Sequence, residues 1–139
     1  MSYEEKGTWV SLVVAVAVYA VYLGIVLGRL SDTPATEVPY VSTLLLTIGV
    51  SIVVSIVARI AVEIARPSDS HASDVRDREI HRHGERVGQG PLIAAALVAL
   101  GLALLDVDHF WIANALYLGF VASSVTGSAV KLVAYRRGM

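Results

Sequence analysis

The stretch VSTLLLTIGVSIVVSIVARIAVEI, residues 41–64, decides the fold class, because it is almost entirely aliphatic and carries only two charged residues. It is long enough to cross a bilayer, which takes roughly 20 apolar residues in an α-helix. Six of its seven polar residues recur at every fourth position and would form one ridge along a helix: Thr43, Thr47, Ser51, Ser55, Arg59 and Glu63. This ridge predicts a membrane helix with one face that contacts other helices rather than lipid.

The whole chain has the composition of an integral membrane protein. Hydrophobic residues make up 55% of its 139 positions and charged residues only 17%, whereas a soluble domain is about a quarter charged. The formal net charge of −1 gives no reason to expect direct nucleic-acid binding, and the absence of cysteine excludes disulfides and thiolate metal sites. Residues 1–7 carry two glutamates and one lysine, unlike the basic start of a signal peptide, so the first apolar block is expected to be retained.

Four apolar segments predict an all-α membrane protein, a four-transmembrane-helix up-and-down bundle in a single domain of residues 1–139. The expected spans are about residues 8–28, 41–64, 87–105 and 110–135, and the longest polar loop is 65–86. Lipid leaves helices and closed barrels as the only spanning structures. Segments of this length exclude the short strands of a barrel.

The distribution of lysine and arginine predicts that both termini lie in the cytoplasm. Basic residues gather in the central loop and near the two chain ends, whereas Arg29 stands alone among the acidic residues of the other two connections. Loops rich in lysine and arginine stay on the cytoplasmic side. The sequence therefore predicts a multi-pass protein of a cytoplasmic membrane, in contact with membrane lipids.

Small residues at four-residue spacing predict close helix contacts. Gly119, Ser123 and Gly127 form such a row in the fourth segment, and Ala20, Gly24 and Gly28 form another in the first. Rows of this kind let helix backbones approach in lipid, where no hydrophobic drive joins helices. Two interpretations stay open: packing within one chain, or a homodimer seam along the fourth segment.

Arg59 and Glu63 are the residues that cost most to place in a membrane. Arg59 is about five residues from the cytoplasmic end of its span, so it can reach the headgroups with Glu63 as its i,i+4 partner. Two alternatives are a subunit interface that hides this intramembrane polar pair, and an ion or substrate site. The latter would make the protein a small oligomeric transporter or ion-conducting protein.

The polar segment before the third span is the predicted contact surface for a cytoplasmic regulatory protein or for lipid headgroups. Asp74 can cap a helix, and Gly84 could end or bend it. The arginines could hold lipid phosphates or pair with their acidic neighbours. The residues assigned to this surface are Asp74, Arg76, Asp77, Arg78 and Gly84.

Motifs for catalysis or metal binding are weak in this sequence. His81 and His83 suggest a metal site, but residues two apart on one helix point in nearly opposite directions, and the spacing is not that of a zinc motif. We therefore predict no metal, no cofactor and no enzymatic activity. The leading interpretation is a non-enzymatic membrane protein that acts through protein–protein contacts, as a homo-oligomer or as an accessory or regulatory subunit.

Three motifs in the second half carry a family resemblance: Asp74-Val-Arg-Asp77, DHFWIANALY at residues 108–117 and KLVAYRR at residues 131–137. With these motifs, residues 74–137 resemble a family of small bacterial membrane proteins of unknown function. Its members have about four spans and an Asp-x-Arg-Asp motif before the third, and they often occur beside small helix-turn-helix regulators. The resemblance implies a bacterial cytoplasmic membrane and a regulatory partner, and it assigns no catalytic residue.

Overall fold

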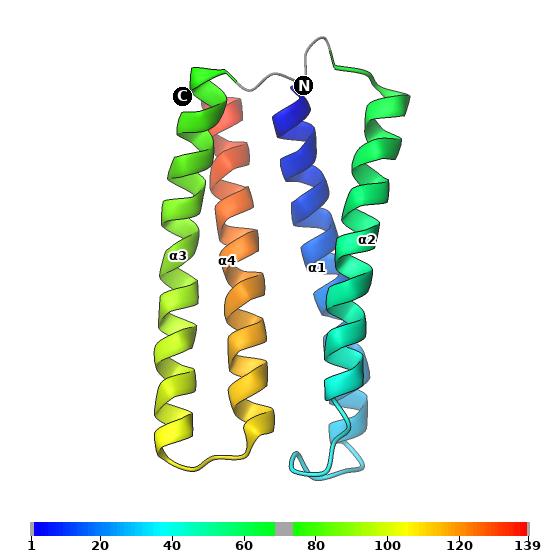
Figure 1. Cartoon of the computed structure of the whole chain (residues 1–139), viewed down its shortest axis with the longest axis vertical. Helices are drawn as coiled ribbons and strands as arrows, with labels where there is room; N and C mark the ends of the chain where they lie inside the picture. The colour runs from blue at the N-terminus through cyan, green and yellow to red at the C-terminus, as the bar shows by residue number, and fades with distance from the viewer. Residues whose placement is uncertain (1, 69–73, 139) are drawn as a thin grey trace.

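The computed structural model describes residues 2–68 and 74–138, which form four long α-helices (Figure 1). Their bounds are α1 (Tyr3–Leu30), α2 (Val41–Ala65), α3 (Val75–Leu104) and α4 (His109–Arg137). Each of the four is long and apolar enough to cross a membrane. The prediction of an all-α protein with four helices of spanning length is confirmed.

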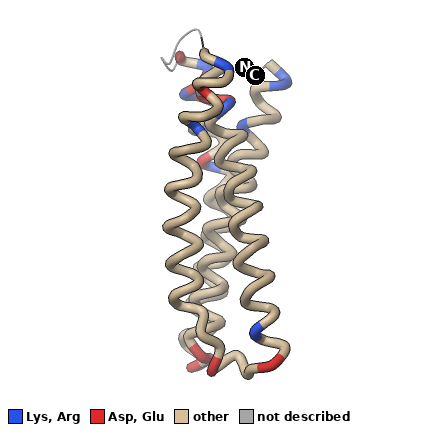
Figure 2. Tube along the Cα trace, turned by 90° about the vertical axis from the view of Figure 1, so that its right-hand side faces the viewer, with Lys and Arg blue, Asp and Glu red and all other residues tan. Residues whose placement is uncertain are grey.

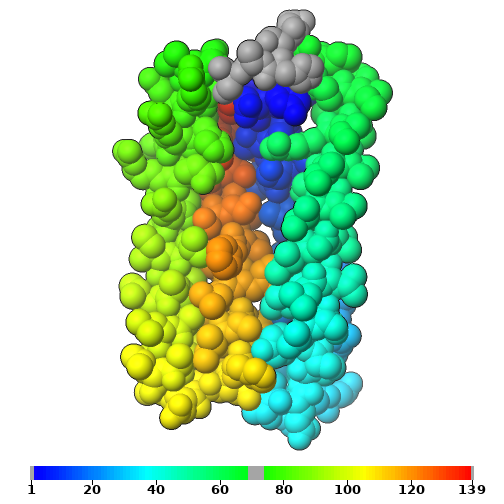
Figure 3. All heavy atoms as spheres, viewed as in Figure 1, coloured from blue at the N-terminus to red at the C-terminus, as the bar shows by residue number. Residues whose placement is uncertain are grey.

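The helices form a curved layer in the order α3, α4, α1, α2, and this layer leaves one side open. Among the described residues, the main contacts join α3 to α4, α4 to α1, and α1 to α2. The space-filling view shows the open side as a groove between α2 and α3, with α4 and α1 behind it (Figure 3). The chain is thus less closed than the bundle that the sequence suggests.

Both chain ends lie at the same end of the molecule, and the basic residues gather there as well (Figures 1 and 2). The opposite end holds Arg29 among acidic residues. We call these the basic end and the acidic end. This separation is the one that the sequence predicts.

Helix α3 begins at Val75, well before residue 87, where the sequence predicts a span. Asp74 and Asp77 form a capping box, in which each side chain accepts a hydrogen bond from the other residue's backbone N–H. The helix continues through Gly84 without a break, so the predicted polar loop is in large part the first turns of α3. Within the predicted loop, residues 69–73 lie outside the described residues.

Glycines in the two halves of the α3–α4 hairpin bring these helices into backbone contact. A Cβ added at Gly119 would collide with the Cβ of Ala95, and one at Gly88 would lie 2.8 Å from the carbonyl oxygen of Ser123. Gly127 faces Gly84 in the same way: a Cβ added at Gly127 would lie only 3.1 Å from the Gly84 carbonyl oxygen. In lipid, such close packing replaces the hydrophobic drive that joins helices in water.

The acidic end contains a buried hydrophobic cluster rich in aromatic residues, built on Tyr22, which is fully buried. The Tyr22 hydroxyl donates a hydrogen bond to Oδ1 of Asn114 on α4. Phe110 and Tyr40 pack nearby with their rings 5.2 Å apart, edge to face. These contacts join α1, α4 and the 31–40 connection at the end away from the termini.

Asp108 caps the start of α4 at this end. Its carboxylate accepts hydrogen bonds from the Phe110 backbone N–H (3.0 Å) and from Nδ1 of His109 (3.1 Å). These two donors, the backbone N–H first, hold the pKa of Asp108 below its usual range. The ionised form is therefore favoured by folding.

The α3–α4 contact gives a first prediction. Gly119→Val should destabilise the protein by about 3 kcal/mol, because the added side chain must push α4 away from Ala95. Gly49→Val on α2 is the matched control, since an added Cβ there meets nothing within 4 Å. Thermal unfolding in detergent, followed by circular dichroism, would measure the difference. Equal loss in both variants would show that the hairpin does not depend on this contact.

The Asp108 cap gives a second prediction. Because folding lowers this pKa, the carboxylate stabilises the protein above the ordinary pKa of aspartate, and this contribution disappears as the pH falls through the folded-state value. Asp108→Asn keeps an oxygen acceptor but does not titrate. Wild type should therefore be the more stable of the two at about pH 6, and this advantage should shrink towards about pH 3. A pH-independent difference in melting temperature would contradict it.

Candidate functional site

The polar ridge of α2 faces other helices at its first two members, Thr43 and Thr47, which are the buried residues of α2. Arg29 of α1 donates a hydrogen bond to the Thr43 hydroxyl over 2.8 Å, and the Thr47 hydroxyl lies 3.0 Å from that of Tyr117 on α4. The prediction of an interhelical contact face is confirmed for this part of the ridge.

At the basic end the ridge finishes in an ion pair between Glu63 and Lys6 of α1. The Lys6 ammonium lies 2.7 Å from Oε2 of Glu63 and also donates to the carbonyl oxygen of Arg66. Glu63 accepts two further hydrogen bonds from Ser68, from its N–H and its hydroxyl. Lys6 is only 7% exposed, so this contact joins the start of α1 to the end of α2 in a largely buried setting.

Arg59 is close to this ion pair but is not bonded to it. Its side chain makes no hydrogen bond or ion pair with any residue in the described ranges, and it is exposed. Its guanidinium rests on α1 at Gly7, where an added Cβ would come 2.7 Å from Nη2. The structure therefore does not bring Arg59 and Glu63 together as the pair that their spacing suggests, because Lys6 takes the carboxylate.

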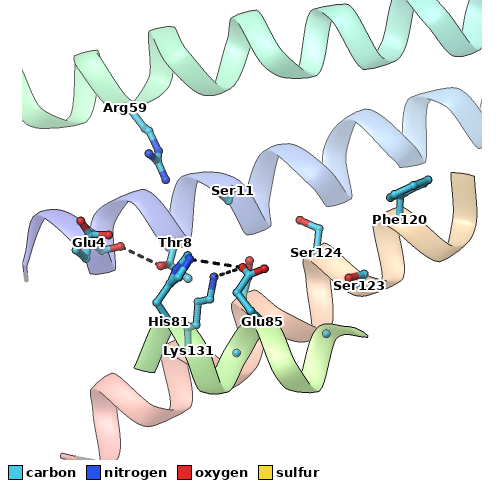
Figure 4. Close-up of a pocket in the computed structure, with 14 residues that line it drawn as sticks. Glu4, Thr8, Ser11, Arg59, His81, Glu85, Phe120, Ser123, Ser124 and Lys131 are labelled. Atoms are coloured by element: carbon cyan, nitrogen blue, oxygen red, sulfur yellow. Dashed lines mark hydrogen bonds and ion pairs between the residues drawn. The ribbon is translucent and has the colours of Figure 1, made fainter. Parts of the chain in front are cut away.

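Arg59 instead lines a polar cavity of about 380 Å³ between the four helices at the basic end, which we call the polar pocket (Figure 4). Figure 4 shows Arg59 extending from α2 towards α1, with Lys131 of α4 beside Glu85 of α3. The remaining lining residues are Glu4, Thr8, Ser11, His81, Gly84, Gly88, Phe120, Ser123, Ser124, Gly127 and Ser128. Of the residues predicted from sequence, the pocket thus brings together Arg59, Gly84, Ser123 and Gly127.

The charged residues of the polar pocket are partly neutralised within it. The Lys131 ammonium lies 2.9 Å from Oε1 of Glu85, and Nε2 of His81 lies 3.8 Å from the same oxygen. Lys131 is 13% exposed, whereas Glu85 is 61% exposed. Arg59 thus differs from Lys131 in having no such partner among the described residues.

Several hydroxyl groups of the polar pocket are also without a partner. The Thr8 hydroxyl donates to the Glu4 carbonyl oxygen one turn earlier, a common arrangement in membrane helices. Within the described part of the chain, no hydrogen bond involves the side chains of Ser11, Ser124 or Ser128. Ser128 is only 6% exposed. These hydroxyls can therefore donate to a group inside the cavity.

An apolar groove continues from the polar pocket towards the middle of the helices. It has a volume of about 180 Å³ and shares Phe120 and Ser124 with the pocket. Its other lining residues come from α1, α2 and α4 and are Ala15, Val18, Tyr19, Ile48, Ser51, Ile52, Tyr117 and Val121. The open side of the layer is thus polar at the basic end and mostly apolar further along.

The motif Asp74-x-Arg76-Asp77 holds the start of α3 to the end of α4. Asp74 and Asp77 supply the capping box, and Asp77 also accepts a hydrogen bond from the Tyr135 hydroxyl over 3.0 Å. Arg76 donates to the Tyr135 carbonyl oxygen over 3.0 Å and lies over its ring, 5.8 Å from the centroid. These residues therefore have structural partners within the chain. Gly84 is likewise buried in the α3–α4 contact.

Arg78 behaves differently from Arg76. It is exposed, and with Arg82 and Arg86 it forms an exposed row at four-residue spacing, which we call the arginine row. None of the three forms a hydrogen bond or ion pair within residues 2–68 and 74–138. The arginine row is therefore free to contact another molecule.

No protein family, curated protein or solved structure matches this chain. The resemblance of residues 74–137 to a bacterial family thus stays a prediction. The described residues also contain no group of three histidine or acidic side chains placed to hold a metal ion. His81 lies near Glu85, and His83 is exposed on α3.

Three residues of these sites were not singled out by sequence reasoning for the roles they have: Lys6, Lys131 and Tyr135. Each acts on a residue far away in the chain, so no local spacing shows its role. Lys6 and Lys131 do carry one usable signal. Both are charged residues at the edges of apolar segments, where a charged side chain is expected to have a partner.

The Lys6–Glu63 ion pair gives a third prediction. Lys6→Met and Glu63→Met should each destabilise the protein, because each leaves one largely buried charge without its counter-charge. The double variant should recover part of the loss, since it removes both charges. Unfolding of the three variants in detergent would measure the coupling. The more exposed pair Lys131–Glu85 is the matched control and should couple weakly. Simple additivity at Lys6 and Glu63 would contradict this assignment.

Proposed function

We propose that this chain is a non-enzymatic multi-pass protein of the bacterial cytoplasmic membrane that acts through protein–protein contacts. Both termini and the arginine row would face the cytoplasm, and the partner would be a regulatory protein with an acidic surface. The observation that carries this proposal is the arginine row. The orientation is favoured by the basic residues at the end that holds both termini.

The arginine row stands out because several charges at the same end have partners within the chain. Lys6 pairs with Glu63, Lys131 with Glu85, and Arg76 binds Tyr135. Folding therefore accounts for those residues, whereas it leaves three adjacent arginines exposed on one side of α3. A row of this kind suits carboxylates on a partner, because arginine binds them in a bidentate way.

The reach of the row favours a protein partner over the membrane surface. Arg78 and Arg86 are separated along the helix axis by about 12 Å, given a rise of 1.5 Å per residue. The headgroup layer on each side of a bilayer is only roughly 5–7 Å thick. If Arg86 lies at the headgroups, Arg78 extends beyond them into water, where a soluble partner can bind.

Assembly with a second copy is a further part of the proposal. The small-residue row Ala20, Gly24 and Gly28 lies exposed on α1, and an added Cβ at Gly24 or Gly28 meets nothing within 4 Å. The corresponding row of α4 is already used against α3. The α1 row thus has room for another helix.

Transport through Arg59 and Glu63 has less support. A carboxylate that carries protons or ions must be able to exchange its partners, but Glu63 is held by the buried ammonium of Lys6 and by Ser68. Arg59 and Glu63 also make no hydrogen bond or ion pair with each other, although both line a small cavity of about 10 Å³. We therefore favour the contact function.

The arginine row gives a fourth prediction, which tests the proposed function. A photo-crosslinking amino acid at Glu79, beside the row, should capture a cytoplasmic protein in cells, and Arg78→Glu with Arg82→Glu should abolish this adduct. Arg66→Glu with Arg137→Glu is the matched control, because it makes the same charge change at exposed residues of the same end. Mass spectrometry would identify the adducts.

Reversing acidic residues on the captured partner should then restore the adduct with the Arg78 and Arg82 double variant. If wild type and both double variants gave the same adducts, the arginine row would be ruled out as the contact surface. Loss in both double variants would also rule it out, since it would indicate a general effect of net charge.

A further inference from the structure

If the four helices span a bilayer as proposed above, the polar pocket at their basic end lies at the level of the headgroups. Its residue Arg59 belongs to α2, but the guanidinium rests on Gly7, in the second turn of α1. Lys131, near the end of α4, and Gly84, near the start of α3, line the pocket at the same end. A lipid headgroup at this depth would therefore lie beside the cavity, on the open side between α2 and α3.

The donors that face the polar pocket suit a phosphate diester. Arg59 presents a guanidinium that has no partner in the described ranges, and Ser11, Ser124 and Ser128 add hydroxyls without hydrogen bonds there. A planar guanidinium binds phosphate oxygens through paired N–H donors, and hydroxyls complete such a site.

The acidic residues of the polar pocket favour a headgroup that also carries a positive charge. Glu4 and Glu85 balance Arg59 and Lys131 in formal charge when His81 is neutral. The Glu4 side chain forms no hydrogen bond or ion pair within the described ranges, and Glu85 is 61% exposed beside Lys131. A net anion would meet two carboxylates here, whereas an ammonium group could bind one of them.

The apolar groove can hold the hydrocarbon part of a ligand whose charged headgroup binds in the polar pocket. It begins at Phe120 and Ser124, the residues it shares with the polar pocket, and continues along Val18, Ile52 and Val121. A cavity that is polar at the headgroup level and apolar deeper down matches an amphiphile with one hydrocarbon chain in the groove.

We propose that the polar pocket and the apolar groove bind one phospholipid with a phosphoethanolamine headgroup. Arg59 and the serine hydroxyls bind the phosphate, Glu4 or Glu85 binds the ammonium, and an acyl chain lies along the groove past Phe120. None of the arginine row lines this site, so it does not depend on the proposed protein contact.

Native mass spectrometry of the full chain in detergent micelles tests the proposal, with phosphatidylethanolamine and phosphatidylglycerol of identical acyl chains. One phosphatidylethanolamine should stay bound, and phosphatidylglycerol should bind more weakly. Arg59→Gln should raise the apparent Kd for phosphatidylethanolamine by about tenfold or more, the expected effect of losing a charge-assisted contact. Arg66→Gln, an exposed arginine at the same end of α2 but outside the pocket, should bind like wild type.

Arg59 is exposed and has no partner among the described residues, so its replacement should leave the unfolding transition unchanged. Inorganic phosphate alone should not displace the lipid, which separates a lipid site from a site for free phosphate. Equal binding of the two lipids, equal affinity of wild type and Arg59→Gln, or displacement by inorganic phosphate would overturn the proposal.

Discussion

The backbone contact between α3 and α4 is the constraint on which the rest of this structure depends. Gly119 and Gly127 of α4 lie against Ala95 and Gly84 of α3, so that face of α4 is fully used. Another face of α4 packs on α1, and α1 in turn carries α2. Among the described residues α2 packs mainly on α1, and the layer stays open between α2 and α3.

Polar contacts between side chains fix how the helices are oriented relative to one another, which apolar contacts alone do not do in lipid. At the acidic end, Tyr22 and Asn114 join α1 to α4, and Arg29 joins α1 to α2 through Thr43. At the basic end, Lys6 and Glu63 join α1 to α2. Such contacts are worth forming because a polar group left alone in hydrocarbon costs several kcal/mol, on the order of a lost hydrogen bond or more.

The sequence predicts the helices well because the signal is local. A long uncharged run needs no knowledge of its neighbours, so the four helices of spanning length follow from hydropathy. The sequence predicts the cap at Asp74 but suggests that Gly84 could end or bend the helix, whereas α3 continues through Gly84 and Gly88. In the fold these glycines are what permits the helix contact.

The polar sites are predicted less well, because their partners are far apart in the chain. The i,i+4 spacing of Arg59 and Glu63 suggests a local pair, but a lysine 57 positions away from Glu63 takes the carboxylate. The pairing of Glu63 with Lys6 rather than with Arg59 has a physical cause. The Lys6 ammonium can bind Glu63 and the Arg66 carbonyl oxygen together, which satisfies the end of α2 as well as the charge.

Their surroundings distinguish the two kinds of arginine that folding leaves without a partner. Arg59 lies beside a cavity lined by all four helices, where unpaired serine hydroxyls and the start of an apolar groove lie close to its guanidinium. Arg78 and Arg82 lie on the outer side of α3, where water screens them and a contact gives specificity more than affinity. The same side chain is therefore suited to holding a ligand in one place and to selecting a partner in the other.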